Sequence, residues 1–349
     1  DEMNTSVFSD KIIKEISLAK ESIDLAMYSM NMELVKEALI EAEQRGVRVN
    51  IILDESRSEQ HEELFGKTSI LDIDSVGNDL DSAGVGDYMH HKFLLIDKES
   101  HDPKLFAGSF NYTAFQEKYD PSFVLETSNA DFIAAIVEEY DLLDRDKRGY
   151  KKLREESYMP FNSKLSYANG DIEVWFSPGF KANSVKYRML DLIEEAEEEI
   201  QIVIWRVTDD DIAKALYAKS LEGVKVKILT DDYYVWGEDS ALNTLFSRAQ
   251  NDENENMEIV SDFYRTLDLG NEIDIDEYFN PYLHQHTMLI DRETVVSGTN
   301  NWTYNGFYKN DEMVFISDVP EVVTDFLDSF DFHYDSLKGR DLDLEFEDG

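Results

Sequence analysis

The chain of 349 residues contains no cysteine, which excludes disulfides, thiolate metal sites, iron–sulfur clusters and cysteine nucleophiles. Basic residues are also scarce, since 33 Lys and Arg stand against 75 Asp and Glu, for a formal net charge of -42. Such a charge disfavours a protein that coats nucleic acid or binds membranes through a polybasic patch. No hydrophobic run approaches the roughly 18 residues that would span a bilayer, so we expect no stable insertion into a membrane.

The chain nevertheless has the apolar residues needed for folded cores. Hydrophobic residues make up 42% of the sequence and aromatic residues 12%, which excludes global disorder. At roughly 150 residues per domain, the length suggests about two domains. The strong acidity suggests a salty or extracellular setting, so we expect a secreted or extracytoplasmic protein.

An internal repeat organises the sequence, because residues 16–54 align with residues 193–231 without a gap. The matched positions carry identical or related residues, such as Ile23 and Ile200, Tyr28 and Trp205, and Gly46 and Gly223. In each copy, apolar residues at helical spacing alternate with strand-like runs, which predicts helix, strand, helix and strand in turn. We therefore expect an α/β protein of two pseudo-symmetric lobes, 1–160 and 161–349, each a mixed, largely parallel sheet flanked by helices.

A charge-dense stretch, 144–156, lies between the two copies and is the best candidate for a linker. It holds the densest basic cluster of the chain: Lys147, Arg148, Lys151, Lys152 and Arg154. Either these side chains form a solvated face of the linker, or they make a local contact with phosphate.

The first lobe carries a histidine motif. His90-x-Lys92 is followed by Asp97 and then, after a glycine, by Ser109 and Asn111. Residues two apart on a strand point to the same side, so His90 and Lys92 are expected to face one pocket. Short polar side chains after a glycine turn can approach the same point, which suits the oxygens of a phosphoryl group.

The second lobe repeats this pattern. Its matching residues are His284, His286, Asp291, Thr299 and Asn301. A single histidine on an apolar strand is more often structural than catalytic. Two copies with the same spacing indicate a shared chemical role instead.

These motifs resemble the phospholipase D superfamily, whose H-x-K-x4-D signature and later G-S-x-N element occur twice in two-lobed members. The resemblance covers nearly the whole chain, and the first copy (MHHKF) looks most like the small nuclease and cardiolipin-hydrolase branch. It implies an active site at the interface between the lobes and phosphodiester hydrolysis that needs no metal or other cofactor. Because both motifs lie in one chain, we expect a monomer.

The resemblance also implies roles for the motif residues. His90 would attack phosphorus and form a covalent phosphohistidine, while His284 would protonate the leaving alcohol; pseudo-symmetry leaves these two roles exchangeable. Five side chains would bind phosphate oxygens: Lys92, Ser109, Asn111, Thr299 and Asn301. Two acids would orient the histidines: Glu126 and Glu312. Two more would anchor the motif strands: Asp97 and Asp291.

The second motif departs from the family pattern, because His286 stands where the family has its second lysine. An imidazole with an ordinary pKa of about 6.5 is only partly protonated at neutral pH, unlike an ammonium group. One hypothesis is a site that works best in mildly acidic conditions. The alternative is a catalytically weak protein that binds phosphate esters, and a metal site at His284 and His286 is a further one.

The reaction class is clearer than the substrate. A polyanion that approaches this acidic chain meets repulsion that salt screens only beyond roughly 8 Å, whereas a phospholipid head group presents a single phosphodiester. We therefore favour phospholipase D-type cleavage of a phospholipid, with transphosphatidylation where an alcohol replaces water, over metal-independent endonuclease activity on DNA or RNA. Tyr233, Tyr234 and Trp236 either pack beneath a loop or form a wall of the substrate cleft.

Overall fold

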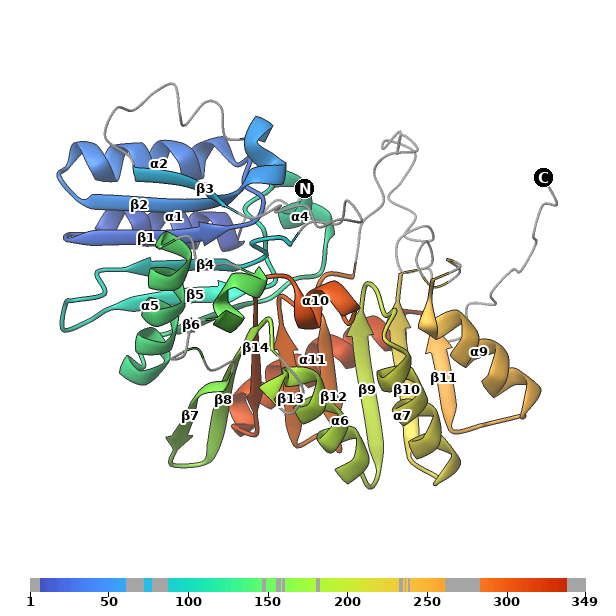
Figure 1. Cartoon of the computed structure of the whole chain (residues 1–349). Coiled ribbons are helices and arrows are strands. Elements are labelled where there is room, and N and C mark those ends of the chain that lie inside the picture. Colours follow the sequence, from blue (N-terminus) through green and yellow to red (C-terminus); the bar gives the residue numbers. More distant parts are fainter. Residues whose placement is uncertain are drawn as a thin grey trace.

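The computed structural model of the chain has two lobes, one formed by the first part of the chain (blue to green in Figure 1) and one by the second (yellow-green to red). The structure describes residues 7–60, 72–76, 87–145, 149–154, 158, 161–179, 183–231, 235, 237, 239–260 and 283–337. The first lobe and the segment after it contain, in chain order, α1 (Val7–Leu18), β1 (Ser22–Met27), α2 (Glu33–Gln44), β2 (Arg48–Asp54), η1 (Glu55–Gln60), β3 (Asp72–Val76), β4 (Lys92–Ile96), β5 (Lys104–Gly108), α4 (Ala114–Tyr119), β6 (Val124–Thr127), α5 (Ala130–Asp144) and η2 (Gly149–Arg154).

The second lobe begins with a strand hairpin next to the boundary expected at residue 160. Its elements are β7 (Phe161–Tyr167), β8 (Gly170–Ser177), α6 (Val185–Glu195), β9 (Glu199–Ile204), α7 (Asp210–Leu221), β10 (Lys225–Thr230), α9 (Ala241–Asn251), β11 (Met257–Val260), β12 (Thr287–Ile290), β13 (Thr294–Gly298), α10 (Tyr304–Tyr308), β14 (Glu312–Ser317) and α11 (Pro320–Leu337).

Each lobe is built on one mixed sheet. The first has six strands in the order β3-β2-β1-β4-β5-β6, and the second has eight in the order β11-β10-β9-β12-β13-β14-β8-β7. In each sheet three neighbouring strands are parallel, namely β1 to β3 and β9 to β11, and the remaining pairs are antiparallel. The predicted class, two mixed sheets flanked by helices, is confirmed, although the parallel part of each sheet is smaller than expected.

Short connections explain the antiparallel part. Only residues 97–103 join β4 to β5, and only residues 291–293 join β12 to β13. A connection this short returns the chain alongside the strand it leaves, whereas a parallel partner needs a crossover of about a dozen residues or more. The histidine motif of each lobe therefore leads into an antiparallel hairpin.

The repeat folds as predicted. Helix, strand, helix and strand follow one another as α1, β1, α2 and β2 in the first copy and as α6, β9, α7 and β10 in the second. Gly46 (φ 91°) and Gly223 (φ 103°) follow α2 and α7 in a left-handed conformation. Glycine adopts this conformation without steric cost, which ends both helices at matching positions.

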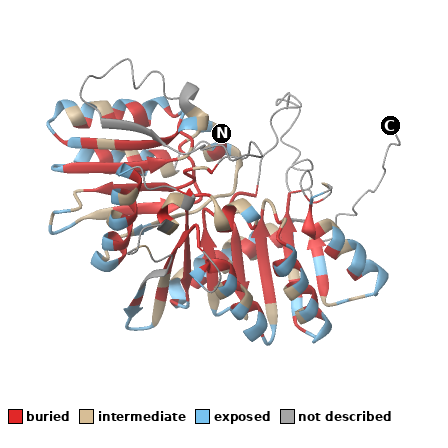
Figure 2. Ribbon diagram, viewed as in Figure 1, coloured by how far each residue is buried: buried red, intermediate tan, exposed pale blue. Residues whose placement is uncertain are grey.

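Three apolar cores hold the molecule together, and Figure 2 shows buried residues concentrated in the two sheets. One core packs α1 and α2 on the first sheet, and another packs α6, α7 and α9 on the second. The third joins the lobes, because side chains such as Phe132 of α5 and Phe326 of α11 pack in one cluster with Phe93 of β4 and Phe315 of β14. This shared core holds each lobe in place against the other, as a site built from both lobes requires.

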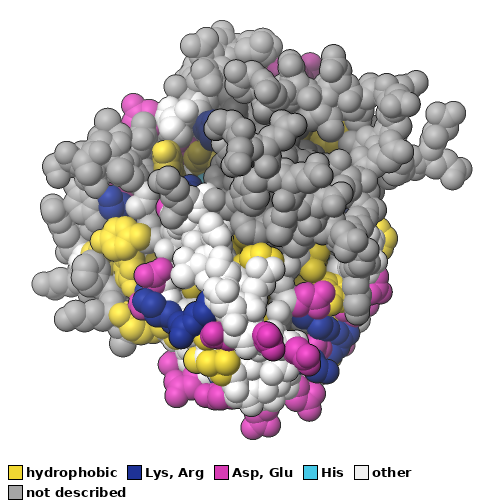
Figure 3. Space-filling model, turned by 90° about the vertical axis from the view of Figure 1, so that its right-hand side faces the viewer, with side chains coloured by type: hydrophobic (Ala, Val, Ile, Leu, Met, Phe, Trp, Pro, Cys, Tyr) yellow, Lys and Arg dark blue, Asp and Glu magenta, His cyan; other side chains and the backbone are white. Residues whose placement is uncertain are grey.

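The surface is charged, and the described helices include none that combines the length and apolarity needed to cross a bilayer. On the face shown in Figure 3, Lys and Arg side chains lie beside Asp and Glu side chains. Arg188, for example, pairs with Glu173 at 3.0 Å. Basic side chains next to acids are partly neutralised, which leaves them less charge for an external anion.

Candidate active site

The two histidine motifs lie where the lobes meet. The backbone N–H of His90 donates to the carbonyl of Asp311 at 2.9 Å, and that of His284 donates to the carbonyl of Pro121 at 3.1 Å. Each motif histidine is therefore held by a backbone bond to the opposite lobe. The ring of His284 in the second lobe also contacts the carbonyl of Ser109 in the first lobe at 3.0 Å, so both motifs contribute to one site.

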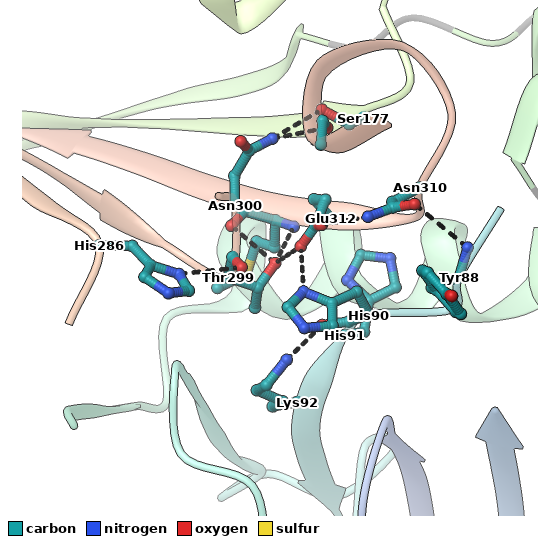
Figure 4. A network of polar contacts seen from close by, with 12 residues as sticks. Tyr88, His90, His91, Lys92, Ser177, His286, Thr299, Asn300, Asn310 and Glu312 are labelled. Atoms are coloured by element: carbon teal, nitrogen blue, oxygen red, sulfur yellow. Dashed lines mark hydrogen bonds and ion pairs between the residues drawn. The ribbon is translucent and has the colours of Figure 1, made fainter. Parts of the chain in front are cut away.

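A carboxylate from the second lobe orients His90. Its Nδ1 lies 2.8 Å from Oε2 of Glu312, which is fully buried at the start of β14 (Figure 4). The Thr299 hydroxyl donates to the same oxygen at 2.5 Å, and the Asn310 amide donates to Oε1 at 3.0 Å. Three donors converge on Glu312, which opposes the rise in its pKa that burial causes and directs the ring of His90.

The ring of His90 is held neutral and in one tautomer. Burial, assisted by the positive charge of Lys92, lowers the pKa of His90 well below its usual range. Because a carboxylate can only accept, Nδ1 of this neutral ring carries the hydrogen and Nε2 keeps its lone pair. A lone pair held in one direction is what attack on phosphorus requires.

The carboxyl group of Glu312 and the ammonium group of Lys92 interact electrostatically near His90. Burial raises the pKa of Glu312 to about 7, although Lys92 acts against this rise. Burial also lowers the pKa of Lys92 to about 7, with Glu312 again opposing the shift. The Lys92 ammonium donates to the carbonyl of His90 at 2.8 Å, which holds it beside the nucleophile, where an anionic ligand would favour its charged form.

The second motif is arranged differently. Nδ1 of His284 donates to the carbonyl of Ser109 at 3.0 Å, and Nδ1 of His286 donates to the carbonyl of Thr299 at 3.0 Å. The two rings lie 4.7 Å apart. Burial, together with the neighbouring His284, lowers the pKa of His286 well below its usual range. This direction is the opposite of what a charged His286 in mildly acidic solution would need.

The prediction that Glu126 orients a histidine is wrong. Glu126 forms an ion pair with Lys11 on a partly exposed part of β6. The sheet register shows why, since Gly108 pairs with Val124 as Gly298 pairs with Val314. Counted back from these pairs, Ser122 occupies in the first lobe the place that Glu312 occupies in the second. The spacing from each glycine to its downstream acid is the signal that would have revealed this.

Close contact with the backbone of the adjoining strand fixes the position of each G-S/T-x-N element. A Cβ atom at Gly108 or Gly298 would collide with the carbonyl of the adjoining strand, so only glycine fits there. Ser109 and Thr299 follow directly and accept from the backbone N–H groups of Phe123 and Met313. Both side chains are fully buried.

Hydrogen-bonding capacity remains at the centre of the site. Oδ1 of Asn111, Oδ1 of Asn301 and Nε2 of His286 are buried without a hydrogen-bond partner among the described residues. The two amides stand at matching positions of the repeat, one from each lobe. Buried polar groups usually find partners, so these three atoms indicate a place that a polar ligand fills.

Asp97 and Asp291 anchor the strands rather than the ligand. Asp97 accepts from the backbone N–H groups of residues 20, 21 and 22 at 2.7 to 3.1 Å. Asp291 accepts in the same way from residues 197, 198 and 199 at 2.7 to 2.9 Å. Each carboxylate ties the end of its motif strand to the start of the neighbouring antiparallel strand, β1 or β9.

The basic cluster between the lobes is not a solvated face throughout. Lys152 is fully buried, forms an ion pair with Glu139 of α5, and lies 2.6 Å from Oδ1 of Asp311. His91 also contacts Glu139, at 2.7 Å. Lys152 thus links Asp311 to Glu139 and, through Glu139, to His91. Neither a solvated face nor a contact with phosphate describes this buried lysine.

Aromatic rings flank both histidines, a feature that the motif pattern did not reveal. The ring of Tyr28 lies 4.7 Å from that of His90, and the ring of Trp205 lies 6.3 Å from that of His284. These two residues occupy matching positions of the repeat, which is a usable signal. Tyr233, Tyr234 and Trp236 lie outside the described residues.

The sequence also allows a metal site at His284 and His286. Within the described ranges, no group of three or more His, Cys, Asp or Glu side chains is placed to hold a metal ion.

Comparisons with known proteins agree with this geometry. A family model described as cardiolipin synthase, PLD-like domain, matches residues 12–143 and 189–334. A phospholipase D from Rickettsia conorii is 37% identical over 114 residues, which cover 33% of this chain and 52% of that protein. The chain thus spans about half the length of the phospholipase D relatives it matches. A cardiolipin synthase A from Buchnera aphidicola is 24% identical over 337 residues, covering 90% of this chain and 64% of that protein.

A solved structure shows the same fold. The phosphatidylserine synthase of Haemophilus influenzae matches with a TM-score of 0.69 at 14% identity, covering 95% of this chain and 84% of that one. At this identity the likeness concerns the fold alone. The family model, by contrast, matches most of both lobes, and the chain therefore belongs to the PLD-like family, with one family region in each lobe.

Proposed function

We propose that this chain is a phosphodiesterase that cleaves the head-group ester of a phospholipid through a covalent phosphohistidine on His90. The contact between Nδ1 of His90 and Glu312 at 2.8 Å carries this proposal. It fixes the tautomer of the ring and places a negative charge behind the nucleophile. His284 has a carbonyl in the matching place, which makes the two histidines unequal.

The first step transfers the phosphatidyl group to the protein. Nε2 of His90 bonds to phosphorus while the bond from phosphorus to the leaving alcohol breaks. The positive charge that develops on the imidazole is balanced by Glu312. His284 gives a proton to the alcohol oxygen; an anionic phosphodiester in the site raises the pKa of His284, which burial otherwise lowers.

The second step releases the product. His284, now neutral, takes a proton from water, whose oxygen bonds to phosphorus as the bond to His90 breaks. Phosphatidic acid leaves, and both histidines return to their starting forms. An alcohol that replaces water would yield a new phosphodiester, which fits the occurrence of proteins named as synthases among the relatives.

Charge and relatives together favour a lipid substrate. The net charge of -42 repels a long polyanion, whereas a phospholipid brings one phosphodiester to the site. The Rickettsia relative named phospholipase D matches at 37% identity.

A substrate panel tests the proposal. The purified chain, with a chelator present, is incubated with mixed phospholipid vesicles and with single- and double-stranded DNA and RNA at low and high salt. We expect phospholipid turnover that is lost in His90→Ala and in His284→Ala. Faster cleavage of nucleic acid at low salt would show that the enzyme is an endonuclease, and phosphate binding without any turnover would show a non-enzymatic protein.

A further inference from the structure

A second cation stands near the catalytic lysine, at a position that no motif marks. Tyr28 directly follows β1, and Arg57 lies in η1, which directly follows β2. β1 and β2 are parallel neighbours. Both residues therefore lie beyond the carboxyl ends of parallel strands, the edge at which open α/β sheets bind their ligands.

Tyr28 connects Arg57 to the site. Its ring meets the ring of His90 at a steep angle, with centroids 4.7 Å apart. Its hydroxyl accepts a hydrogen bond from Nη2 of Arg57 at 2.9 Å. Cζ of Arg57 and Nζ of Lys92 lie 5.0 and 5.3 Å from the centroid of the same ring. Two cations thus share one aromatic ring, and that ring contacts the nucleophile.

Arg57 forms no ion pair with any residue that the structure describes. Asp54 lies close enough for Arg57 to lower its pKa, but its carboxylate accepts from the backbone N–H groups of Ser56 and Met89. Nε of Arg57 is buried and has no hydrogen-bond partner within the described ranges. In a chain with 75 acidic and 33 basic residues, a guanidinium beside this site whose buried Nε has no partner among the described residues indicates an anionic ligand.

The second lobe supplies no comparable charge from its motif. His286 stands at the lysine position, and burial keeps its ring neutral by lowering its pKa. Arg206, which follows Trp205 in the chain, forms an ion pair with Asp239. The site therefore has Lys92 and Arg57 on the first-lobe side, opposite a neutral imidazole.

We propose that Arg57 binds a non-bridging oxygen of the scissile phosphate and supplies the second positive charge that His286 does not. This inference rests on the proposed function, since it concerns the same phosphate. A planar guanidinium can donate parallel N–H bonds to phosphate, and the Tyr28 hydroxyl positions it. With Lys92, it neutralises the charge that accumulates on the equatorial oxygens as His90 attacks.

A suppression experiment tests the role of Arg57. The substrate is bis(p-nitrophenyl) phosphate, which carries one phosphate and no other anionic group. Arg57→Gln should lower kcat/KM about 10- to 100-fold, as expected for a lost hydrogen bond to a charged group. Adding His286→Lys to Arg57→Gln should restore most of this loss, because an ammonium group then faces the same phosphate. Arg248→Gln removes an equal charge from exposed α9 and should leave kcat/KM within about two-fold.

Three results would overturn the inference. The first is an unchanged kcat/KM in Arg57→Gln, and the second is a fall in kcat/KM that His286→Lys does not restore. The third is a fall in kcat/KM that occurs only with phospholipids that have an anionic head group, which would instead indicate a head-group subsite. Binding of orthovanadate, a phosphate analogue, separates the inference from the proposed function because it needs no turnover. Weaker binding by Arg57→Gln, restored by His286→Lys, supports Arg57 even if the wild type cleaves nothing. Equal binding by all variants of an inactive wild type rejects both proposals.

Discussion

Replacing Glu312 by Gln removes one negative charge from behind His90 and changes the shape of the side chain very little. The glutamine oxygen can still accept from Nδ1 of His90 and from the Thr299 hydroxyl. Its amide nitrogen then faces the amide nitrogen of Asn310, whose oxygen is held by the backbone N–H of Tyr88 at 3.2 Å. The variant therefore loses the charge and gains one contact between two donors.

The lost charge sets the size of the effect. A unit charge that faces the developing imidazolium at about 4 Å contributes about 4 kcal/mol at an effective dielectric constant of about 20. This corresponds to roughly a 10³-fold fall in kcat. Since burial raises the pKa of Glu312 to about 7, the wild type loses the same charge as the pH falls below 7. The ratio between wild type and Glu312→Gln should therefore be largest near pH 8 and smaller near pH 6.

The matched control is Glu126→Gln. Glu126 belongs to the corresponding strand of the other lobe but pairs with Lys11 at the surface, so this variant should retain kcat within about two-fold. Both variants are assayed for phospholipid turnover between about pH 6 and 8, with thermal unfolding as the check on folding. Equal losses in the two variants, or full activity in Glu312→Gln, would refute the asymmetry between the histidines.

Two further predictions concern buried titratable side chains. Lys152→Met leaves Glu139 and Asp311 buried without their cation, so the free energy of unfolding, measured with urea, should fall by about 3 to 5 kcal/mol. Lys164→Met breaks an exposed pair with Asp171 and should change the free energy of unfolding far less, because solvent screens that pair; similar costs in the two variants would contradict the buried network. His286→Gln, a neutral replacement, should leave the acid side of the rate profile unchanged from about pH 5 to 7, because the pKa of His286 is already lowered well below that range by burial. A profile whose acid side shifts in this variant would show that His286 becomes charged in the wild type.

The lobes and the motif histidines could be predicted because their signals are local. Helical and strand spacing repeat over residues 16–54 and 193–231, and His90 and His284 each precede an apolar strand. The duplication predicts that the two motifs share one site between the lobes. In the structure, the histidine of each motif is bonded to the backbone of the opposite lobe. The short turns after Asp97 and Asp291 make the parallel part of each sheet smaller than the alternation of strands and helices predicts.

Contacts between distant residues could not be predicted in the same way. Lys152 reaches Asp311 across more than 150 positions of the chain, and no periodicity marks such a pair. Arg57 becomes informative only through what surrounds it, a ring that contacts His90 and no ion-pair partner among the described residues. Glu126 lies near the expected position of the acid in the sequence, and only the strand register counted from Gly108 distinguishes it from Ser122.

Trapping the covalent intermediate tests the role of His90 most directly. His284→Ala is mixed with bis(p-nitrophenyl) phosphate, whose leaving group needs no proton, and the reaction is quenched in alkali because phosphohistidine is labile in acid. We expect a burst of one nitrophenolate per protein, followed by a stall, since no base then activates water. Peptide mass spectrometry should find the nitrophenyl phosphoryl group on His90. A burst without modified His90, or the same modification in a His90→Ala, His284→Ala double variant, would contradict the proposed mechanism.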